Sequence, residues 1–98
     1  MADKITAEQL KSQETNFVIL DVREPDELES GKIDSSTHMP LGLIIRNVKK
    51  KQIEHLKGRK ICTYCGTGYR GNIAADELLK EGFDAVTLEG GYPSWAQS

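Results

Sequence analysis

Cys65-Gly66-Thr67-Gly68-Tyr69-Arg70 is the most informative part of this sequence. Before it, Lys60-Ile61-Cys62-Thr63-Tyr64 is rich in β-branched and aromatic residues and predicts a strand. After it, residues 71–80 predict a helix. A cysteine therefore opens a short, glycine-rich loop where a strand ends and a helix begins. At such a point, free backbone N–H groups and the positive end of the helix dipole favour an anion.

Cys65 is the candidate nucleophile of this loop. We expect the amide groups and the helix dipole to favour its thiolate, which is the reactive form of cysteine. Gly66 and Gly68 let the backbone turn inward around the sulfur. The alternative is an inert core cysteine followed by glycines that only make a turn. The strand–loop–helix context favours the reactive cysteine.

Strand and helix patterns alternate along the rest of the chain. An apolar run at residues 17–22 predicts a strand covered on both faces, and further strands are predicted at 38–39 and 85–88. Capping residues and apolar periodicity predict helical segments at 6–12, 25–30, 41–48 and 52–56, and a last one that carries Trp95. This order indicates an α/β fold in which helices cover both sides of a mostly parallel sheet. The Cys65 loop then lies in a crevice at the carboxyl ends of the strands.

Four further motifs accompany the loop in a fixed order. They are Leu20-Asp21-Val22-Arg23-Glu24-Pro25-Asp26-Glu27-Leu28, Gly31-Lys32-Ile33, His38-Met39-Pro40 and Leu88-Glu89-Gly90-Gly91-Tyr92-Pro93-Ser94-Trp95. Together with the loop, they resemble the rhodanese (sulfurtransferase) family over nearly the whole chain. The resemblance implies one rhodanese-like domain over residues 1–98, with a central, mostly parallel, five-stranded sheet.

The same resemblance implies a sulfurtransferase or sulfur carrier. Cys65 would take sulfane sulfur from a donor, either thiosulfate or a persulfide, and hold it as a cysteine persulfide. It would then pass the sulfur to a thiol or a cyanide-like acceptor. The expected substrate-binding residues are those of the loop: Gly66, Thr67, Gly68, Tyr69, Arg70 and Gly71. The reaction needs no metal or organic cofactor.

Arg70 has two candidate roles. It either binds an anionic substrate, or pairs with Asp21 or Glu24 at the neighbouring strand end and holds the loop open. Asp21, Arg23 and Glu24 correspond to family positions that support the site, so we expect them to be structural rather than catalytic.

Loop length separates sulfur transfer from dephosphorylation. Cysteine phosphatases use C-x-x-x-x-x-R, whereas only four residues separate Cys65 from Arg70 here. The smaller cradle suits the single terminal sulfur of a persulfide.

Two residues depart from the family pattern. Gly66 stands where many thiosulfate-using members carry a basic residue, and Gly71 stands where serine or alanine is common, which we expect to loosen the helix start.

Cys62 completes a C-x-x-C motif with Cys65. Residues three apart on a strand point to opposite faces, which favours a small buried hydrophobe at Cys62 over a resolving thiol. The C-x-x-C motif nevertheless leaves a thiol redox protein as one alternative function. Another is a non-catalytic rhodanese-like module for binding or regulation, although such modules commonly lack the cysteine.

Composition excludes several other classes. The net charge of −2 argues against a general nucleic-acid or membrane-surface binder, and the N-terminal residues carry no signal-peptide or membrane-spanning pattern, so we expect a cytoplasmic protein. His38 and His55 are too isolated to predict a zinc site.

Residues 46–60 carry seven basic side chains, which form either a solvated surface or a docking surface for an acidic protein partner or an anionic donor.

Overall fold

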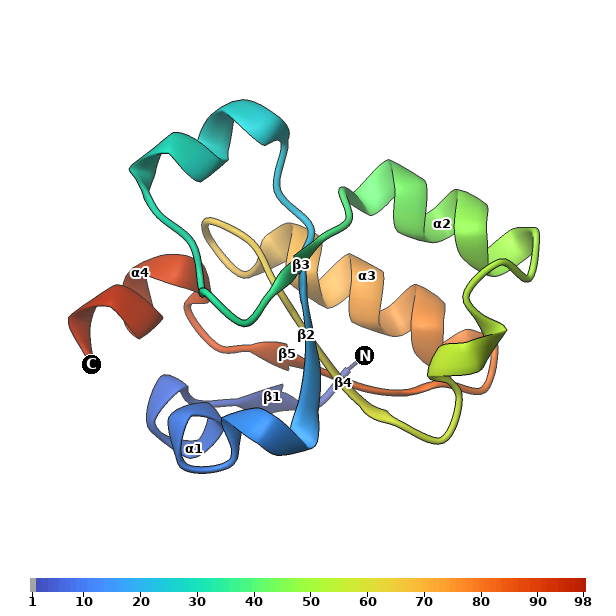
Figure 1. Ribbon diagram of the computed structural model, residues 1–98, viewed down its shortest axis with the longest axis horizontal. Helices are drawn as coiled ribbons and strands as arrows, with labels where there is room; N and C mark the ends of the chain where they lie inside the picture. The colour runs from blue at the N-terminus through green and yellow to red at the C-terminus, as the bar shows by residue number, and fades with distance from the viewer. Residues whose placement is uncertain (1) are drawn as a thin grey trace.

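The computed structural model describes residues 2–98 and contains one central sheet within that range (Figure 1). Its five strands are ordered β1-β5-β4-β2-β3, and all four pairings are parallel. The strands are β1 Lys4–Ile5, β2 Phe17–Asp21, β3 Thr37–His38, β4 Lys60–Tyr64 and β5 Asp84–Leu88. The prediction of an α/β fold with a largely parallel, five-stranded sheet is confirmed.

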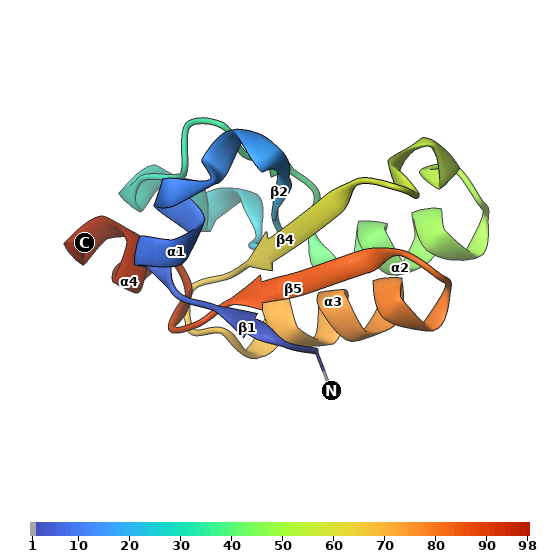
Figure 2. The same ribbon diagram turned by 90° about the horizontal axis from the view of Figure 1, so that it is seen from below.

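Helical segments connect these strands and cover the sheet (Figure 2). The α-helices are α1 Ala7–Ser12, α2 Leu41–Lys49, α3 Tyr69–Lys80 and α4 Gly91–Gln97. Three 3₁₀ segments are η1 Glu14–Asn16, η2 Pro25–Ser30 and η3 Glu54–Leu56. None of the helices within residues 2–98 combines the length and the apolar character that crossing a membrane requires.

The core has two halves, one on each face of the sheet. On one face, Leu20 and Ile61 pack with Ile44 of α2 and Leu78 of α3. On the other face, Ile19, Cys62 and Tyr64 pack with Leu10 of α1 and with partly buried Trp95 of α4. The alternation along β2 and β4 follows from the period of two in a strand. Helices therefore cover both faces, as predicted.

The sheet register brings the carboxyl ends of three strands to one edge. Asp21 of β2 is aligned with Tyr64 of β4, and Thr63 of β4 is aligned with Thr87 of β5. The segments that follow β2, β4 and β5 consequently meet at this edge, where ligands bind in open parallel sheets. The loop that begins at Cys65 is the central one of the three.

Three elements differ from the sequence predictions. The pairing of β1 with β5 was not predicted, since two residues are too few to show a strand pattern. The segment Pro25–Ser30 is a 3₁₀ helix that ends at Gly31, whose φ is +119°. Helix α3 begins at Tyr69 rather than at residue 71, directly after Gly68, whose φ is +99°. As a consequence, Arg70 lies in the first turn of the helix and not in the loop.

Candidate active site

Cys65 lies directly after β4, and its side chain is fully buried. Its Sγ accepts two backbone hydrogen bonds, from the N–H of Gly68 at 3.0 Å and from the N–H of Gly71 at 3.3 Å. One donor comes from the loop and the other from the first turn of α3. Both belong to the set of amides that a helix start leaves without helical partners. The sulfur thus occupies a position built for negative charge.

Gly71 allows α3 to approach the sheet closely enough for this contact. A Cβ atom at this position would lie 2.7 Å from Oγ1 of Thr87 and 3.3 Å from the Cα of Tyr64. The carbonyl of Gly71 accepts a hydrogen bond of 2.6 Å from Oγ1 of Thr63. The expectation that glycine loosens the helix start here was wrong, because it permits close packing that a larger residue would prevent.

The turn after β5 holds the other side of the loop. The N–H of Tyr92 donates to the carbonyl of Cys65 at 2.8 Å. Gly91 has a φ of +67°, and a Cβ atom there would lie only 2.5 Å from that same carbonyl oxygen. The Gly90-Gly91 turn is therefore required by the close approach of two backbones. This glycine motif is evident in the sequence, but its contact with the reactive loop is not.

Arg70 forms a bidentate ion pair with Glu27 of η2. Its Nη1 lies 2.6 Å from Oε2 of Glu27, and its Nη2 lies 2.5 Å from Oε1. The hydrogen bonds from Arg70 lower the pKa of Glu27 to about 2. Pairing with an acidic residue was one of the two predicted roles, but the predicted partners, Asp21 and Glu24, were wrong. The 3₁₀ turn brings Glu27, three residues further on than Glu24, to the guanidinium.

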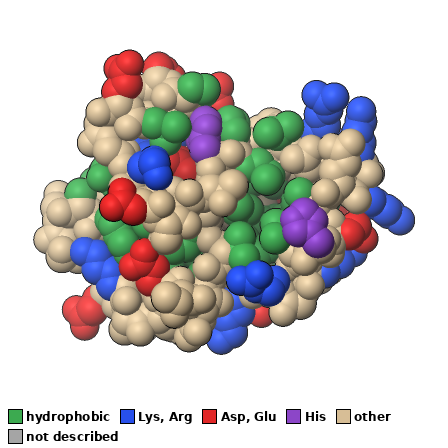
Figure 3. Space-filling view, viewed as in Figure 1, with side chains coloured by type: hydrophobic (Ala, Val, Ile, Leu, Met, Phe, Trp, Pro, Cys, Tyr) green, Lys and Arg blue, Asp and Glu red, His purple; other side chains and the backbone are tan. Residues whose placement is uncertain are grey.

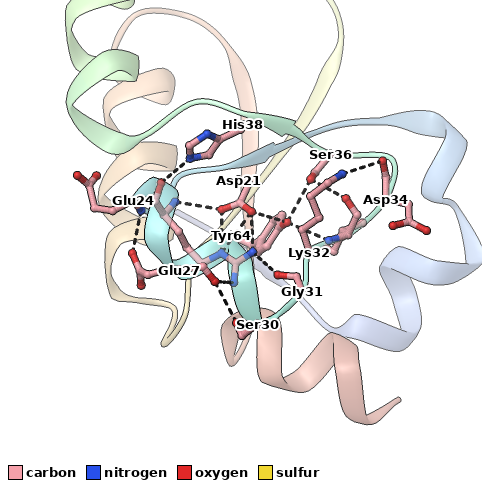
Figure 4. Close-up of polar contacts among 12 residues, drawn as sticks. Asp21, Glu24, Glu27, Ser30, Gly31, Lys32, Asp34, Ser36, His38 and Tyr64 are labelled. Atoms are coloured by element: carbon pink, nitrogen blue, oxygen red, sulfur yellow. Dashed lines mark hydrogen bonds and ion pairs between the residues drawn. The ribbon is translucent and has the colours of Figure 1, made fainter.

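Asp21 and Arg23 form a buried ion pair, and Figure 4 shows Asp21 next to Tyr64. Arg23 donates to Oδ2 of Asp21 through Nη2 at 2.8 Å, and to Oδ1 through Nε at 3.0 Å. The hydroxyl of Tyr64 donates to the same carboxylate at 2.8 Å. Burial acts to raise the pKa of Asp21, but the hydrogen bonds from Arg23 and Tyr64 outweigh it and lower that pKa.

Arg23 also contacts the backbone in the middle of η2 and directly after it. It donates to the carbonyl of Gly31 at 2.8 Å and to the carbonyl of Glu27 at 3.3 Å. Glu24 acts through its backbone, because its N–H donates to Oε2 of Glu27 at 2.8 Å (Figure 4). The three residues expected to support the site thus surround the segment that carries Glu27, and none of them contacts Cys65 in the hydrogen bonds described.

Two cavities flank the loop. One has a volume of about 450 Å³ and opens beside Gly66; its walls are Arg23, Asp26, Glu27, Glu29, Ser30, Gly66, Tyr92 and Pro93. The other, of about 260 Å³, lies behind the loop and is lined by Lys4, Thr67, Gly68, Tyr69, Asn72, Thr87, Leu88, Glu89 and Gly90. Of the expected substrate-binding residues, Tyr69 points outward and is 73% exposed.

Cys62 lies on the other face of the sheet from Cys65. The two thiols belong to different halves of the core, and both are free. Burial raises the pKa of Cys62 to about 12, which keeps it as a neutral thiol. This arrangement fits the small buried hydrophobe expected at Cys62. It offers Cys65 no neighbouring thiolate for a disulfide.

The basic residues of 46–60 lie at the far end of the molecule from the site. Figure 3 shows Lys and Arg side chains gathered beyond the end of α2. This segment leads into the amino end of β4, whereas Cys65 follows its carboxyl end. Within residues 2–98, no three His, Cys, Asp or Glu side chains come together as a metal site.

Comparisons with known proteins give a consistent family. The model of the rhodanese-like domain matches residues 5–98. A sulfurtransferase of Allochromatium vinosum is 32% identical over 101 residues, which cover 99% of this chain and 91% of that protein. A mitochondrial protein of Schizosaccharomyces pombe is 32% identical over 81% of this chain, and the chain spans 63% of its length. Among solved structures, the rhodanese-related protein of Thermoplasma volcanium has a TM-score of 0.82 and 32% identity, covering 97% of this chain and 91% of that one.

Proposed function

The chain belongs to the rhodanese family, and from that premise we propose that it transfers sulfane sulfur through a persulfide on Cys65. The observation that carries the proposal is the pair of N–H groups, of Gly68 and Gly71, that point at the Cys65 sulfur. A hydrogen bond to a charged acceptor contributes about 1.5–3 kcal/mol. Two such bonds therefore stabilise negative charge on Sγ when sulfur transfer places it there.

In the first half-reaction, the Cys65 thiolate attacks the outer sulfur of the donor. A new S–S bond forms to Sγ, and the bond between the outer sulfur and the rest of the donor breaks. The remainder leaves with the electron pair, as sulfite from thiosulfate or as a thiolate from a persulfide. The enzyme is left as the Cys65 persulfide, so that one difficult transfer is divided into two steps.

In the second half-reaction, an acceptor thiolate or a cyanide-like nucleophile attacks the outer sulfur of that persulfide. The bond from the acceptor to sulfur forms as the bond to Sγ breaks, and Cys65 leaves as the thiolate. The amides of Gly68 and Gly71 then stabilise the returning charge where they already contact sulfur.

The reactive sulfur is buried in the resting structure, so the loop moves before transfer. Cys65 is fully buried, whereas Gly66 and Gly68 are partly exposed and Thr67 is exposed. The cavity beside Gly66 is the larger of the two spaces at the loop and is the approach we assign to substrate. A shift of Gly66 and Thr67 that keeps the N–H groups of Gly68 and Gly71 on the sulfur uncovers Sγ toward that cavity.

Sulfur transfer from thiosulfate and from a small persulfide to cyanide, followed as thiocyanate, tests the proposal. Cys65→Ser removes all transfer, because oxygen cannot form the persulfide, while circular dichroism shows an unchanged fold. Cys62→Ala is the matched control and retains most of the activity. An essential Cys62 with a dispensable Cys65 would overturn the assignment.

A further inference from the structure

We propose that Asp26 and Glu29 make this site select sulfur carriers with a positive charge near the sulfur over anionic carriers. The inference rests on the proposed function, since it names the substrate class of that same site. It is carried by the cavity of about 450 Å³ beside Gly66, the residue that directly follows the nucleophile. Three carboxylates line this cavity, and Arg23 is the only cation among its lining residues within 2–98.

The charges around the cavity do not balance. Arg23 is neutralised by Asp21, with Nη2 and Oδ2 2.8 Å apart in the buried interior. Glu27 is neutralised by Arg70 through the bidentate pair. Asp26 and Glu29 remain; both are exposed, and neither is among the ion pairs found within residues 2–98. The mouth of the cavity thus carries two uncompensated negative charges.

The distribution of charge over the whole molecule also disfavours the approach of an anion to this cavity. Asp and Glu side chains gather over η2, whereas the Lys and Arg side chains of residues 46–60 gather at the opposite end (Figure 3). Arg70 cannot serve as a free anion-binding group while Glu27 holds both of its terminal nitrogens. Gly66 supplies no side chain at all. An approaching dianion therefore meets repulsion, and the cavity walls described within residues 2–98 offer it no free cation.

The remaining walls suit a short organic carrier. Tyr92 and Pro93 line the same cavity as Asp26 and Glu29 of η2 and supply apolar surface to it. A carrier whose methylene groups lie on these rings would place a nearby ammonium group toward Asp26 and Glu29. The substrate class is thus an aminothiol or its persulfide, with the amine a few bonds from sulfur.

Surface charges of this kind act over a Debye length, which is about 30 Å at 0.01 M salt and about 3 Å at 1 M. Two carboxylates at the mouth of a site change the relative rates of cations and anions by roughly fivefold to tenfold at low salt. The size and the salt dependence of this ratio are the quantities to measure.

The first arm of the test requires no sulfur transfer. Cys65 is modified with two methanethiosulfonates of similar size, the cationic aminoethyl and the anionic sulfonatoethyl reagents, and the rates are followed by intact mass with Cys65→Ser as the blank. We expect the cation-to-anion rate ratio to fall roughly fivefold or more in Asp26→Asn/Glu29→Gln at about 0.01 M salt, and by less than about twofold at about 0.5 M. Glu81→Gln/Asp84→Asn removes the same charge at exposed positions near the amino end of β5 and should leave the ratio within about twofold of wild type.

The second arm uses the preformed Cys65 persulfide and three acceptors: cysteamine, 2-mercaptoethanol and 3-mercaptopropionate. Because these thiols differ in acidity, the comparison is between their rate ratios in wild type and in the Asp26→Asn/Glu29→Gln variant. The cysteamine-to-mercaptopropionate ratio should fall as in the first arm.

The outcomes of the two arms separate the two proposals. If the first arm shows the charge effect but no persulfide ever forms, the acidic mouth is upheld and the sulfurtransferase assignment fails. If the ratios do not respond to Asp26→Asn/Glu29→Gln, or respond equally to the control variant, the charge selection proposed here is wrong.

Discussion

Glu27 and Arg70, 43 residues apart in sequence, face each other through two hydrogen bonds of 2.6 and 2.5 Å. This pair joins η2 to the first turn of α3, the turn whose Gly71 N–H contacts the Cys65 sulfur. Arg70 is therefore not free to bind substrate, and it holds the first turn of α3 against η2 beside the reactive loop. The pair also fixes which charges remain free at the mouth of the neighbouring cavity.

The Glu27–Arg70 pair should make stability depend on acid pH. The pKa of Glu27 is about 2 in the folded protein, against an ordinary value of 4.5, so its stabilisation is present above pH 4.5 and is lost as pH falls toward 2. Because both side chains are about one-third exposed, with values of 30% and 33%, we expect a contribution of only about 1 kcal/mol.

Urea unfolding of wild type and of Glu27→Gln, measured from pH 7 to pH 2, checks this contribution. The variant should be about 1 kcal/mol less stable at pH 7, and the two curves should converge near pH 2. A constant difference over the whole range would show that the substitution acts through packing and not through the charge of Glu27.

Gly66→Arg should improve thiosulfate as a donor. Gly66 is not among the residues with positive φ, and a Cβ atom there would lie 3.6 Å from Oε1 of Glu27, an ordinary contact distance. The structure therefore accommodates a Cβ atom at this position, from which an arginine side chain adds the missing cation. One charge-assisted hydrogen bond corresponds to roughly a tenfold gain in kcat/KM.

The comparison for this prediction uses kcat/KM for thiosulfate and for an uncharged persulfide donor, with Gly66→Ala as the matched control. The gain should be confined to thiosulfate and to the arginine variant. A well-folded Gly66→Arg with unchanged thiosulfate kinetics would mean that the absent cation does not limit this donor.

Gly91→Ala should destabilise the protein and disturb the reactive loop. The new Cβ would lie 2.5 Å from the carbonyl oxygen of Cys65, at a residue whose φ is +67°. Strain of this kind costs about 1–3 kcal/mol. Gly42→Ala in α2 is the matched control, since nothing lies within 4 Å of its Cβ position and alanine favours a helix by about 1 kcal/mol.

Chemical denaturation of both alanine variants gives the answer directly. Gly91→Ala should lose about 2 kcal/mol or more of unfolding free energy, whereas Gly42→Ala should be neutral or more stable. Equal effects of the two substitutions would contradict the close approach of the Gly90-Gly91 turn to Cys65.

Local patterns predicted the strand–loop–helix unit around Cys65 well. The strand at residues 60–64 has the predicted bounds, and the opposite orientations of Cys62 and Cys65 follow from the period of a strand. The parallel sheet followed from the alternation of strands and helices. These features depend on residues that are close together in the sequence, so they can be predicted from the sequence of one chain.

The features that were missed depend on contacts between distant segments. The partner of Arg70 is set by the 3₁₀ geometry of η2, which the sequence motif around Pro25 does not specify. The strand at Lys4–Ile5 exists because β5 offers it an edge. The packing role of Gly71 depends on Thr87, which approaches only in the folded sheet. The glycine pair at 90–91 is evident in the sequence. The carbonyl of Cys65, which this pair approaches, cannot be identified from the sequence.

The intact mass of the protein after incubation with a sulfane sulfur donor tests the formation of a Cys65 persulfide most directly. Thiosulfate, inorganic polysulfide and a small persulfide should each be tried, followed by removal of excess donor and peptide mapping. We expect a gain of about one sulfur atom (~32 Da) that maps to Cys65, persists in Cys62→Ala and disappears on treatment with cyanide, as persulfide covalent catalysis requires. A wild-type mass that stays unchanged with all three donors, or added sulfur that maps to Cys62, would contradict it.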